Sequence, residues 1–412
     1  MNLPHLPARP SLRPLDEALA ELLAQAQPLG RIETVPLAEA DGRVLANDLV
    51  SPLQVPPYDN SAMDGYALRA ADAAAIGAEL PVSQRIPAGA APQPLAAGTA
   101  ARIFTGAPVP AGADAVVMQE NTEIAGDGVV RFLQQPKTGQ NLRRSGDDIR
   151  RGATVLRAGQ RIGPAALGLA ASMGFDRLPV AARPRVALLS TGDELVMPGT
   201  IPPSELPAGV IYNSNRFFLR RLLERAGCVV TDLGNVPDTR AATEEALREA
   251  AAGHDLVLAS GGVSVGEEDH LRPAVQALGR LDLWQVAIKP GKPFAYGRIA
   301  DTHVIGLPGN PVSSFVTFLL LARPFVLRIQ GATDLAVPAT EFTAGFDWPR
   351  PDKRREFLRV RRNPGGTLDL FPNQSSGVLT SLSWADGLVD NPPGQPIARG
   401  DRVRFIALAD LL

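Results

Sequence analysis

Apolar runs of strand length alternate with amphipathic helical segments between Arg185 and Pro311, and this alternation restricts the fold more than any other feature of the sequence. Helices are expected at Asn213–Ala226 and Thr239–Ala252, with Asp238 as cap of the second. Strands are expected at Arg185–Ser190, Cys228–Leu233, Asp255–Ser260, Trp284–Ile288 and His303–Leu307. Such repetition predicts a doubly wound α/β domain whose parallel sheet is covered on both faces and binds ligands at the carboxyl ends of its strands.

The sequence on either side of this region has a different character. Pro14–Gln27 and Gly163–Gly174 are expected to be helices, and the Gly- and Pro-rich stretch from Ala78 to Gly152 predicts a small inserted β-rich domain. Beyond Gly331 short strand candidates separated by Pro, Gly and Asn predict a small all-β domain. These candidates are Glu356–Val360, Thr367–Phe371, Gly377–Leu382 and Arg402–Leu408.

Composition excludes several classes of protein. With 41 basic and 43 acidic residues the chain has no overall positive charge for nucleic acid. A single cysteine, Cys228, excludes internal disulfides and Cys-rich metal sites, and the four histidines lack metal-ligand spacing. The apolar stretch Phe315–Leu327 is interrupted by Arg323 and Pro324 and falls short of the roughly 20 residues of a membrane span. We therefore expect a soluble cytoplasmic protein with no membrane or nucleic-acid partner.

Three loops at the expected strand ends have the composition of an anion-binding cleft. In Ser260–Asp269 the glycines, Gly261, Gly262 and Gly266, let backbone N–H groups approach an anion, and Ser264 adds a hydroxyl donor. Ser190–Glu194 follows the first strand, and Leu307–Pro311, with Pro308, Gly309 and Asn310, opens a helix. Each loop alone could equally be a plain turn. Together they favour a cleft for a mononucleotide or a pterin phosphate.

Three charged segments are further candidates. Lys289–Pro293 places two ammonium groups three residues apart, and these would either neutralise oxyanions or be solvated. Pro57–Tyr66 carries two carboxylates that suit Mg²⁺ ligation or a base role, although local Asx-turn hydrogen bonds explain them equally well. Asn141–Asp148 pairs two arginines with two carboxylates, as an oxyanion site or an exposed turn would.

These segments, in this order, closely resemble the molybdopterin molybdenumtransferase family, the bacterial molybdenum-insertion proteins related to the E domain of gephyrin. The resemblance runs from about Leu15 to the C-terminal strands and is most specific at Tyr58–Tyr66. It is also carried by Thr105–Pro110, Ser190–Leu195, Gly261–Asp269, Ile288–Phe294 and Leu307–Pro311. The Gly261–Asp269 type of loop is shared with the adenylyltransferases that act one step earlier.

The resemblance implies four domains and a homodimer whose cleft draws on both subunits. Residues 11–50 plus 148–182 would form an elongated linker domain, 51–147 the inserted β-rich domain, 183–330 the molybdopterin-binding α/β domain and 331–412 a β-barrel-like domain. The adenylyltransferase and molybdoenzyme apoproteins are implied as further partners.

The resemblance also implies the reaction, which is the last step of molybdenum cofactor synthesis. Adenylylated molybdopterin is hydrolysed with Mg²⁺ and molybdate, AMP leaves, and molybdenum stays on the dithiolene, whose thiolates are soft metal ligands. The residues implied for catalysis and the metal are Asp64, Glu194 and Asp269. Those implied for substrate are Thr105, Arg143, Asp148, Asp238, Lys289 and Lys292, with Arg359 and Ser376 as weaker matches.

Two other functions fit parts of the sequence. A carrier that binds molybdopterin without turnover would use the same cleft, but several carboxylates beside a polyanion repel it unless a metal bridges them. A molybdopterin adenylyltransferase would need the α/β domain alone, so the three remaining domains are not expected of it.

Overall fold

The computed structural model describes residues 12–263 and 270–411 of the chain. Its central six-stranded sheet has the order β16, β13, β17, β21, β20, β18. Neighbours among the first four strands are parallel, whereas β20 and β18 run antiparallel. The strand bounds are β16 Val229–Val236, β13 Arg185–Thr191, β17 Leu256–Ser260, β21 Thr302–Leu307, β20 Ala295–Ile299 and β18 Arg280–Trp284. The doubly wound α/β prediction is confirmed, and the antiparallel edge is an addition to it.

Alternate residues of the sheet face two different cores. Val186 and Leu188 of β13 pack with α1, α3, α6 and α7, whereas Ala187 and Leu189 pack with α4 and α5. A strand with apolar side chains on both faces needs helices on both, which is why the strands read as continuous apolar runs. The helices are α1 Leu15–Gln25, α3 Asn215–Arg225, α4 Arg240–Gly253, α5 Leu271–Leu278, α6 Pro311–Thr317 and α7 Arg323–Ile329.

The cap of α4 differs from the sequence prediction. Thr239, not Asp238, is the N-cap, and its hydroxyl accepts the Ala242 N–H at 3.2 Å. Because Thr239 supplies the cap, the carboxylate of Asp238 is left for another use.

The apolar stretch near Phe315 is longer than the sequence interpretation allowed. Helix α6, the π-helical turn η5 (Phe318–Ala322) and α7 form one helix from Pro311 to Ile329, and Pro324 lies inside it, just after the π-helical turn. Among the described residues this 19-residue helix is long and apolar enough to cross a membrane. However, 83% of its apolar 18-residue window is buried, as in the core helix of a folded domain.

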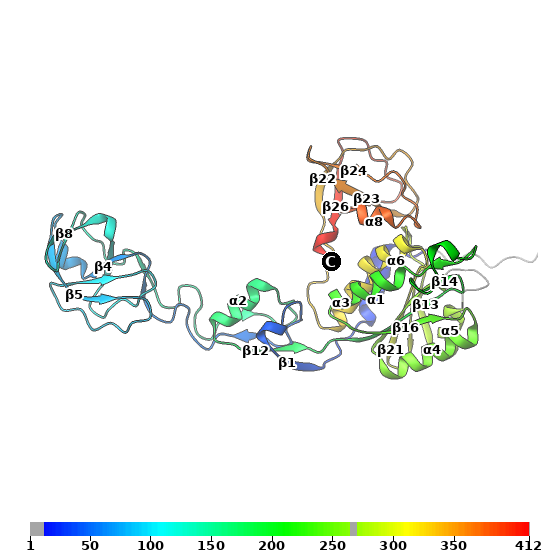
Figure 1. The fold of residues 1–412 in the computed structure, drawn as a ribbon, viewed down its shortest axis with the longest axis horizontal. Coiled ribbons are helices and arrows are strands. Elements are labelled where there is room, and N and C mark those ends of the chain that lie inside the picture. Colours follow the sequence, from blue (N-terminus) through cyan, green and yellow to red (C-terminus); the bar gives the residue numbers. More distant parts are fainter. Residues whose placement is uncertain (1–11, 264–269, 412) are drawn as a thin grey trace, which may run out of the picture.

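Two segments that are distant in the sequence pair with each other in the part of the molecule next to the α/β domain. Strand β1 (Ile32–Pro36) pairs with β12 (Arg177–Ala181), and β2 (Leu49–Val50) pairs with β11 (Thr154–Leu156), beside helix α2 (Pro164–Ser172). These elements share one hydrophobic cluster. In Figure 1 they form the narrow middle part of the molecule.

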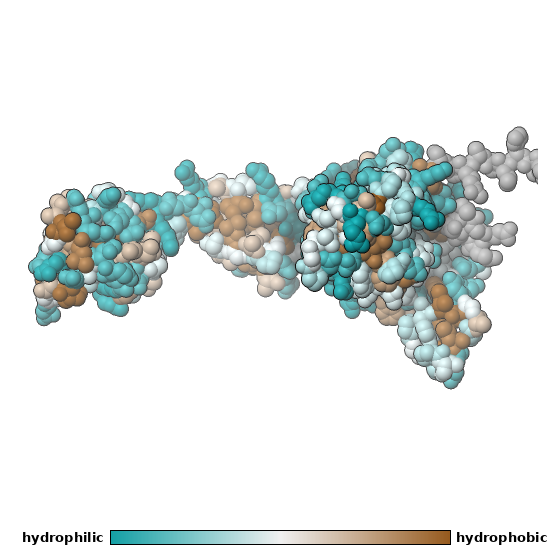
Figure 2. Space-filling view, turned by 90° about the horizontal axis from the view of Figure 1, so that it is seen from above, coloured by the Kyte–Doolittle hydropathy of each residue, from teal (hydrophilic) through white to brown (hydrophobic). Residues whose placement is uncertain are grey.

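The far lobe, at the left of Figure 1, is a six-stranded sheet in the order β7, β4, β6, β5, β9, β8. The bounds are β7 Ala115–Met118, β4 Gly65–Leu68, β6 Ala100–Ile103, β5 Glu79–Ile86, β9 Val129–Phe132 and β8 Thr122–Gly126. The short strands β3 (Asn60–Ser61) and β10 (Leu142–Arg143) pair beside it. We call residues 51–147 the distal lobe. Figure 2 shows a mainly hydrophilic surface with separate hydrophobic patches on this lobe and on the middle part.

The C-terminal region is a closed five-stranded barrel. Its order is β23, β24, β22, β26, β25, with β25 pairing back to β23. The bounds are β23 Arg355–Arg362, β24 Thr367–Leu370, β22 Thr340–Ala344, β26 Arg402–Ala407 and β25 Gly387–Asn391. The strand predicted at Gly377–Leu382 is wrong. The structure has helix α8 (Thr380–Trp384) there, because a run this short does not distinguish the two periods.

Candidate functional site

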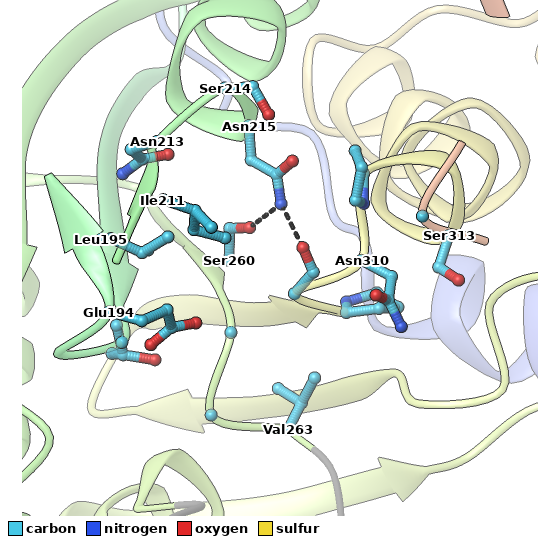
Figure 3. Close-up of a pocket in the computed structure, with 18 of the residues that line it drawn as sticks. Glu194, Leu195, Ile211, Asn213, Ser214, Asn215, Ser260, Val263, Asn310 and Ser313 are labelled. Carbon is cyan, nitrogen blue, oxygen red and sulfur yellow. Dashed lines mark hydrogen bonds between the residues drawn. The ribbon is translucent and has the colours of Figure 1, made fainter. Parts of the chain in front are cut away.

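A pocket of about 670 Å³ lies at the carboxyl ends of β13, β17 and β21, as doubly wound sheets predict. The three predicted loops meet there. Thr191, Gly192 and Glu194 come from the first loop, Ser260 to Val263 from the second, and Pro308, Gly309 and Asn310 from the third. Figure 3 shows Glu194, Ser260 and Asn310 around this space. The structure therefore brings together the predicted residues Glu194, Gly261, Gly262, Pro308, Gly309 and Asn310.

A fourth wall of the pocket, residues 211–215, was missed by sequence reasoning. The segment was assigned mostly to a helix, but α3 begins at Asn215, so Asn213 and Ser214 precede it and line the pocket. The side-chain amide of Asn215 donates to Ser260 Oγ at 3.0 Å and to the Gly309 carbonyl at 2.6 Å (Figure 3). The Asn-Ser-Asn cluster at the predicted helix start was the available signal, since such residues prefer helix caps to helix interiors.

Several buried polar atoms at this pocket have no hydrogen-bond partner within residues 12–263 and 270–411. They are Ser190 Oγ, Thr191 Oγ1, Asn213 Nδ2 and Asn215 Oδ1. Each of these side chains is less than 9% exposed. Buried polar groups are nearly always paired in folded proteins, and leaving one unpaired is unfavourable. A polar ligand in the pocket would supply the missing partners.

Gly261 allows the second loop to pass against the first. Its φ is +99°, and a Cβ placed there would lie 2.6 Å from the Thr191 carbonyl oxygen and 2.8 Å from Thr191 Oγ1. An L side chain therefore meets both a steric clash and an unfavourable backbone conformation at this position. The absence of a side chain at Gly261 is therefore what lets the two loops lie this close beside the pocket.

Carboxylates gather at one side of the pocket. The backbone N–H of Asp238 donates to Asp193 Oδ1 at 3.0 Å, and Asp238 and Glu194 both line the pocket. Burial raises the pKa of Asp238, and the charges of Asp193 and Glu194 raise it further. Glu194 and Asp238, which the sequence assigned to different roles, therefore line the same pocket, and their negative charges favour an added positive charge there.

Lys289 is paired with carboxylates of the barrel, although the sequence suggested that its ammonium group would either bind a ligand oxyanion or be solvated. Its ammonium group lies 3.2 Å from Glu356 Oε1 and 3.4 Å from Asp352 Oδ2. Strand β19 (Ile288–Lys289) pairs in parallel with β23, which joins this segment to the barrel. Hydrogen bonds from Arg354, together with the nearby Lys289 charge, hold the pKa of Asp352 well below its usual range. Lys292 is partly exposed, and its ammonium group has no ion-pair partner in the described part of the chain.

The barrel contributes a loop to the pocket, and a buried arginine behind this loop holds it in place. Arg359 is 1% exposed and donates to Ser381 Oγ and to the carbonyls of Phe357 and Ser375. None of these acceptors is charged, and burial lowers the pKa of Arg359 to about 10. The loop after Ser375 reaches the pocket, since Ser376 accepts the Val312 N–H at 3.0 Å and Gly377 lines the pocket. Arg359 thus anchors a pocket loop while carrying an unneutralised charge.

Four predicted residues belong to the distal lobe or to the segment next to it, and this lobe lies at the opposite end of the molecule from the α/β domain (Figure 1). They are Asp64, Thr105, Arg143 and Asp148. Asp64 Oδ1 accepts the N–H and the hydroxyl of Thr105, both at 2.8 Å, and these hydrogen bonds lower the pKa of Asp64. Arg143 and Asp148 are exposed. The neighbouring Asp59 pairs with Arg144 at 2.6 Å, a contact between segments 85 residues apart rather than the local Asx-turn considered for it. One chain therefore does not bring Asp64, Thr105, Arg143 or Asp148 to Glu194.

The three remaining predicted residues, Ser264, Gly266 and Asp269, lie outside the described residues. Within the described ranges no group of three or more His, Cys, Asp or Glu side chains is arranged to hold a metal ion. The predicted ligand set of Asp64, Glu194 and Asp269 is therefore not assembled in the described part of one chain.

Comparisons with known proteins agree with this architecture. Residues 13–174 match the "MoeA N-terminal region (domain I and II)", 187–328 the "Probable molybdopterin binding domain" and 341–408 the "MoeA C-terminal region (domain IV)". The molybdopterin molybdenumtransferase of Haemophilus influenzae is 43% identical over 77% of this chain and 78% of its own length. Molybdopterin molybdenumtransferase 2 of Mycobacterium tuberculosis is 39% identical over 93% of this chain and 95% of its own.

A solved structure shows the same fold over the whole length. The molybdopterin biosynthesis moeA protein of Pyrococcus horikoshii superposes with a TM-score of 0.84 at 31% identity, covering 96% of this chain and 100% of that one. The resemblance stated from the sequence motifs is thereby confirmed. The chain belongs to the molybdopterin molybdenumtransferase family.

Proposed function

We propose that this chain is a molybdopterin molybdenumtransferase that inserts molybdenum into adenylylated molybdopterin and releases AMP. The observation that carries the proposal is the pocket of the α/β domain, where buried polar atoms lack partners beside glycine backbone. The domain that holds this pocket matches the molybdopterin-binding family domain. We retain the four predicted domains and a cytoplasmic location as parts of this proposal.

The pocket would bind the phosphate-bearing part of the substrate. Gly261 and Gly309 expose backbone groups, and Thr191, Asn213 and Asn215 offer unpaired donors and acceptors. Asp238 would accept hydrogen bonds from N–H groups of the pterin, since carboxylate oxygens are acceptors. A polar, backbone-lined pocket of this kind suits a ligand with many hydrogen-bonding groups.

Molybdate, the second substrate, would be attracted by the cations on the barrel side. Arg359 is buried with neutral acceptors only, so an oxyanion nearby would supply the countercharge that the protein lacks. Lys292 and Ser376 are the predicted neighbours for such an anion. Lys289, already paired with Glu356 and Asp352, would instead hold the segment Lys289–Pro293 against the barrel.

Mg²⁺ fits the acidic side of the pocket in part. Asp193 and Glu194 lie close enough to Asp238 for their charges to raise its pKa. Carboxylate oxygens are the ligands that Mg²⁺ prefers. Glu194, with Asp64 and Asp269 of the predicted ligand set, would hold the ion. When bound, Mg²⁺ would neutralise substrate phosphate oxygens.

A homodimer would reconcile the separation of the predicted residues. Asp64 and Thr105 belong to the distal lobe at one end of the elongated chain, and strands β13 and β21, whose following loops line the pocket, lie at the other end (Figure 1). We propose that the distal lobe of one subunit faces the pocket of its partner, so that Asp64 of one chain and Glu194 of the other act in one site. Closed two-fold symmetry would form two such sites per dimer.

The test is a turnover assay with purified protein, adenylylated molybdopterin, Mg²⁺ and molybdate. We expect AMP release that depends on molybdate and yields a product able to activate a molybdoenzyme apoprotein. Tight binding without AMP release would favour a carrier. Consumption of ATP with metal-free molybdopterin would favour an adenylyltransferase. Either result would overturn the proposed function.

A further inference from the structure

The guanidinium group of Arg102, on β6 of the distal lobe, holds the turn that carries Asp64. Its Nη1 donates to the Gly65 carbonyl at 2.9 Å, and its Nη2 donates to Gln119 Oε1 at 2.6 Å. Gln119 in turn donates its backbone N–H to the Asp64 carbonyl at 3.0 Å. The carbonyls of Asp64 and Gly65 are thus fixed by two residues that are themselves hydrogen-bonded to each other.

The backbone at this point has no room to move sideways. A Cβ placed on Gly65 would lie 1.9 Å from the Val117 carbonyl oxygen, so β4 packs directly on the backbone of β7. With one side closed by β7 and the carbonyls held by Arg102 and Gln119, the direction in which the Asp64 side chain leaves the turn is determined by these contacts.

Aromatic rings hold the guanidinium plane of Arg102 in turn. Its Cζ lies 4.7 Å from the centroid of Phe104 and 5.2 Å from that of Tyr66. No carboxylate in the described residues forms an ion pair with Arg102, so its charge is not neutralised locally. The pKa of Asp64 is lowered chiefly by the N–H and hydroxyl of Thr105, and the Arg102 charge lowers it further.

Only one of the two carboxylate oxygens of Asp64 is hydrogen-bonded in this arrangement. Thr105 occupies Oδ1, and within the described residues Oδ2 accepts no hydrogen bond. The end of β6 therefore provides both residues that orient Asp64, because Thr105 follows Arg102 by three residues. Thr105 orients the carboxylate, and Arg102 fixes the backbone from which it projects.

We propose that Arg102 is a positioning residue for Asp64. Arg102 itself does not touch the substrate, but it orients Asp64 so that the free carboxylate oxygen of Asp64 points at the substrate. The inference rests on the proposed function, in which Asp64 acts in the reaction. It adds a residue to the site that neither the sequence motifs nor the pocket contains.

The chain provides a matched control in Arg85. This residue is the register partner of Arg102 on β5, and its Cζ lies 4.6 Å from the centroid of the same Phe104 ring. In the described structure Arg85 forms no hydrogen bond with Gly65 or Gln119. Arg85→Met therefore removes the same charge from the same ring and leaves the Asp64 turn intact.

The experiment measures molybdate-dependent AMP release by full-length Arg102→Met, Arg102→Lys, Arg85→Met, Asp64→Asn and the double variant Asp64→Asn with Arg102→Met. We expect Arg102→Met to lower kcat about 10- to 100-fold, as loss of a supporting residue does, with little change in KM for molybdate. Arg102→Lys should recover only part, since one ammonium cannot span both acceptors. Arg85→Met should stay within about twofold of wild type.

The double variant separates positioning from an independent role. If Arg102 acts through Asp64, the double variant is no slower than Asp64→Asn alone. Equal kcat for Arg102→Met and Arg85→Met, or a double variant slowed by the product of the two single effects, would overturn the inference. If Arg102→Met does not fold, Gln119→Leu at the exposed end of the same network should give a smaller loss of kcat in the same direction.

Amide hydrogen exchange tests the same turn without turnover. The Gln119 N–H, which donates to the Asp64 carbonyl, should exchange faster in Arg102→Met and unchanged in Arg85→Met. Wild-type protein that releases no AMP would contradict the proposed function alone. Unchanged exchange at Gln119 in Arg102→Met would contradict the positioning role, whatever the activity.

Discussion

The side-chain amide of Asn215 donates to the carbonyl oxygen of Gly309 at 2.6 Å, and so ties the start of α3 to the loop that opens α6. The same amide nitrogen also donates to Ser260 Oγ at 3.0 Å. Three loops of the pocket are thereby held by one buried side chain that is 7% exposed.

We expect Asn215→Ala to lower the free energy of unfolding by about 1–3 kcal/mol, because the buried Ser260 hydroxyl and the partly buried Gly309 carbonyl lose their donor. Binding of adenylylated molybdopterin should weaken as the loops separate. Thermal unfolding and calorimetric titration measure the two effects. Ser214→Ala, the exchange at the half-buried neighbour, is the control and should leave stability nearly unchanged. An Asn215→Ala protein with wild-type binding would show that the loops need no such tie.

Gly261→Ala should damage both folding and ligand binding. The added Cβ would lie 2.6 Å from the Thr191 carbonyl oxygen at a φ of +99°, so the loop must shift, at a cost of order 1–3 kcal/mol. Gly253→Ala at the end of α4 is the matched control, because no atom lies within 4 Å of its Cβ position and its φ is ordinary. Unfolding curves of the two variants make the comparison, and equal stabilities would contradict the close approach of the two loops.

Asp238→Asn should stabilise the protein at neutral pH. The pKa of Asp238 is raised in the folded state by burial and by Asp193, so the folded protein binds this proton more tightly than the unfolded chain does. Stability contributed by this group therefore falls as pH rises above its ordinary value of 3.8 and stays low once the folded pKa is passed. The variant should melt higher than wild type at pH 7, and the difference should vanish below about pH 4. A difference that does not depend on pH would contradict this origin.

Arg359→Met should raise the KM for molybdate about tenfold or more while the protein remains folded. The substitution removes a buried charge that has neutral acceptors only, so its loss is tolerated better than the loss of a paired charge. Arg361→Met, two residues along β23 and exposed, is the control for a general loss of positive charge. Initial rates over a range of molybdate concentrations measure the effect. Equal KM values for both variants would place molybdate elsewhere.

Mixing two strongly impaired variants should restore activity if each site uses both subunits. Asp64→Asn damages the distal lobe and Glu194→Gln damages the pocket, so a mixed dimer contains one intact site. After random exchange of subunits, half the dimers are mixed and each has one of two sites intact, which gives about a quarter of wild-type AMP release. Each variant alone should release AMP only at a small residual rate. A mixture without activity would mean that the site is built within one chain or that the subunits do not exchange.

The sequence by itself determined the α/β core and the loops of the pocket. Apolar runs such as Val186–Leu189, repeated between amphipathic helical segments, predict strands covered on both faces, and glycine-rich loops after three such strands together predict a cleft. The Asp64 and Thr105 segments were found as motifs, and the structure joins them by hydrogen bonds. These features are local in the sequence, so periodicity and residue type suffice to predict them.

Only the tertiary structure decided the pairings between distant residues. Nothing near Lys289 in the sequence indicates Glu356 as its partner, and nothing near Asn215 indicates Gly309. The helix at Thr380–Trp384 and the antiparallel strands β20 and β18 likewise depend on what they pack against, because their short sequences suit either conformation. The separation of Asp64 from Glu194 is the largest such result. It follows from an elongated arrangement that residue spacing along the chain does not encode.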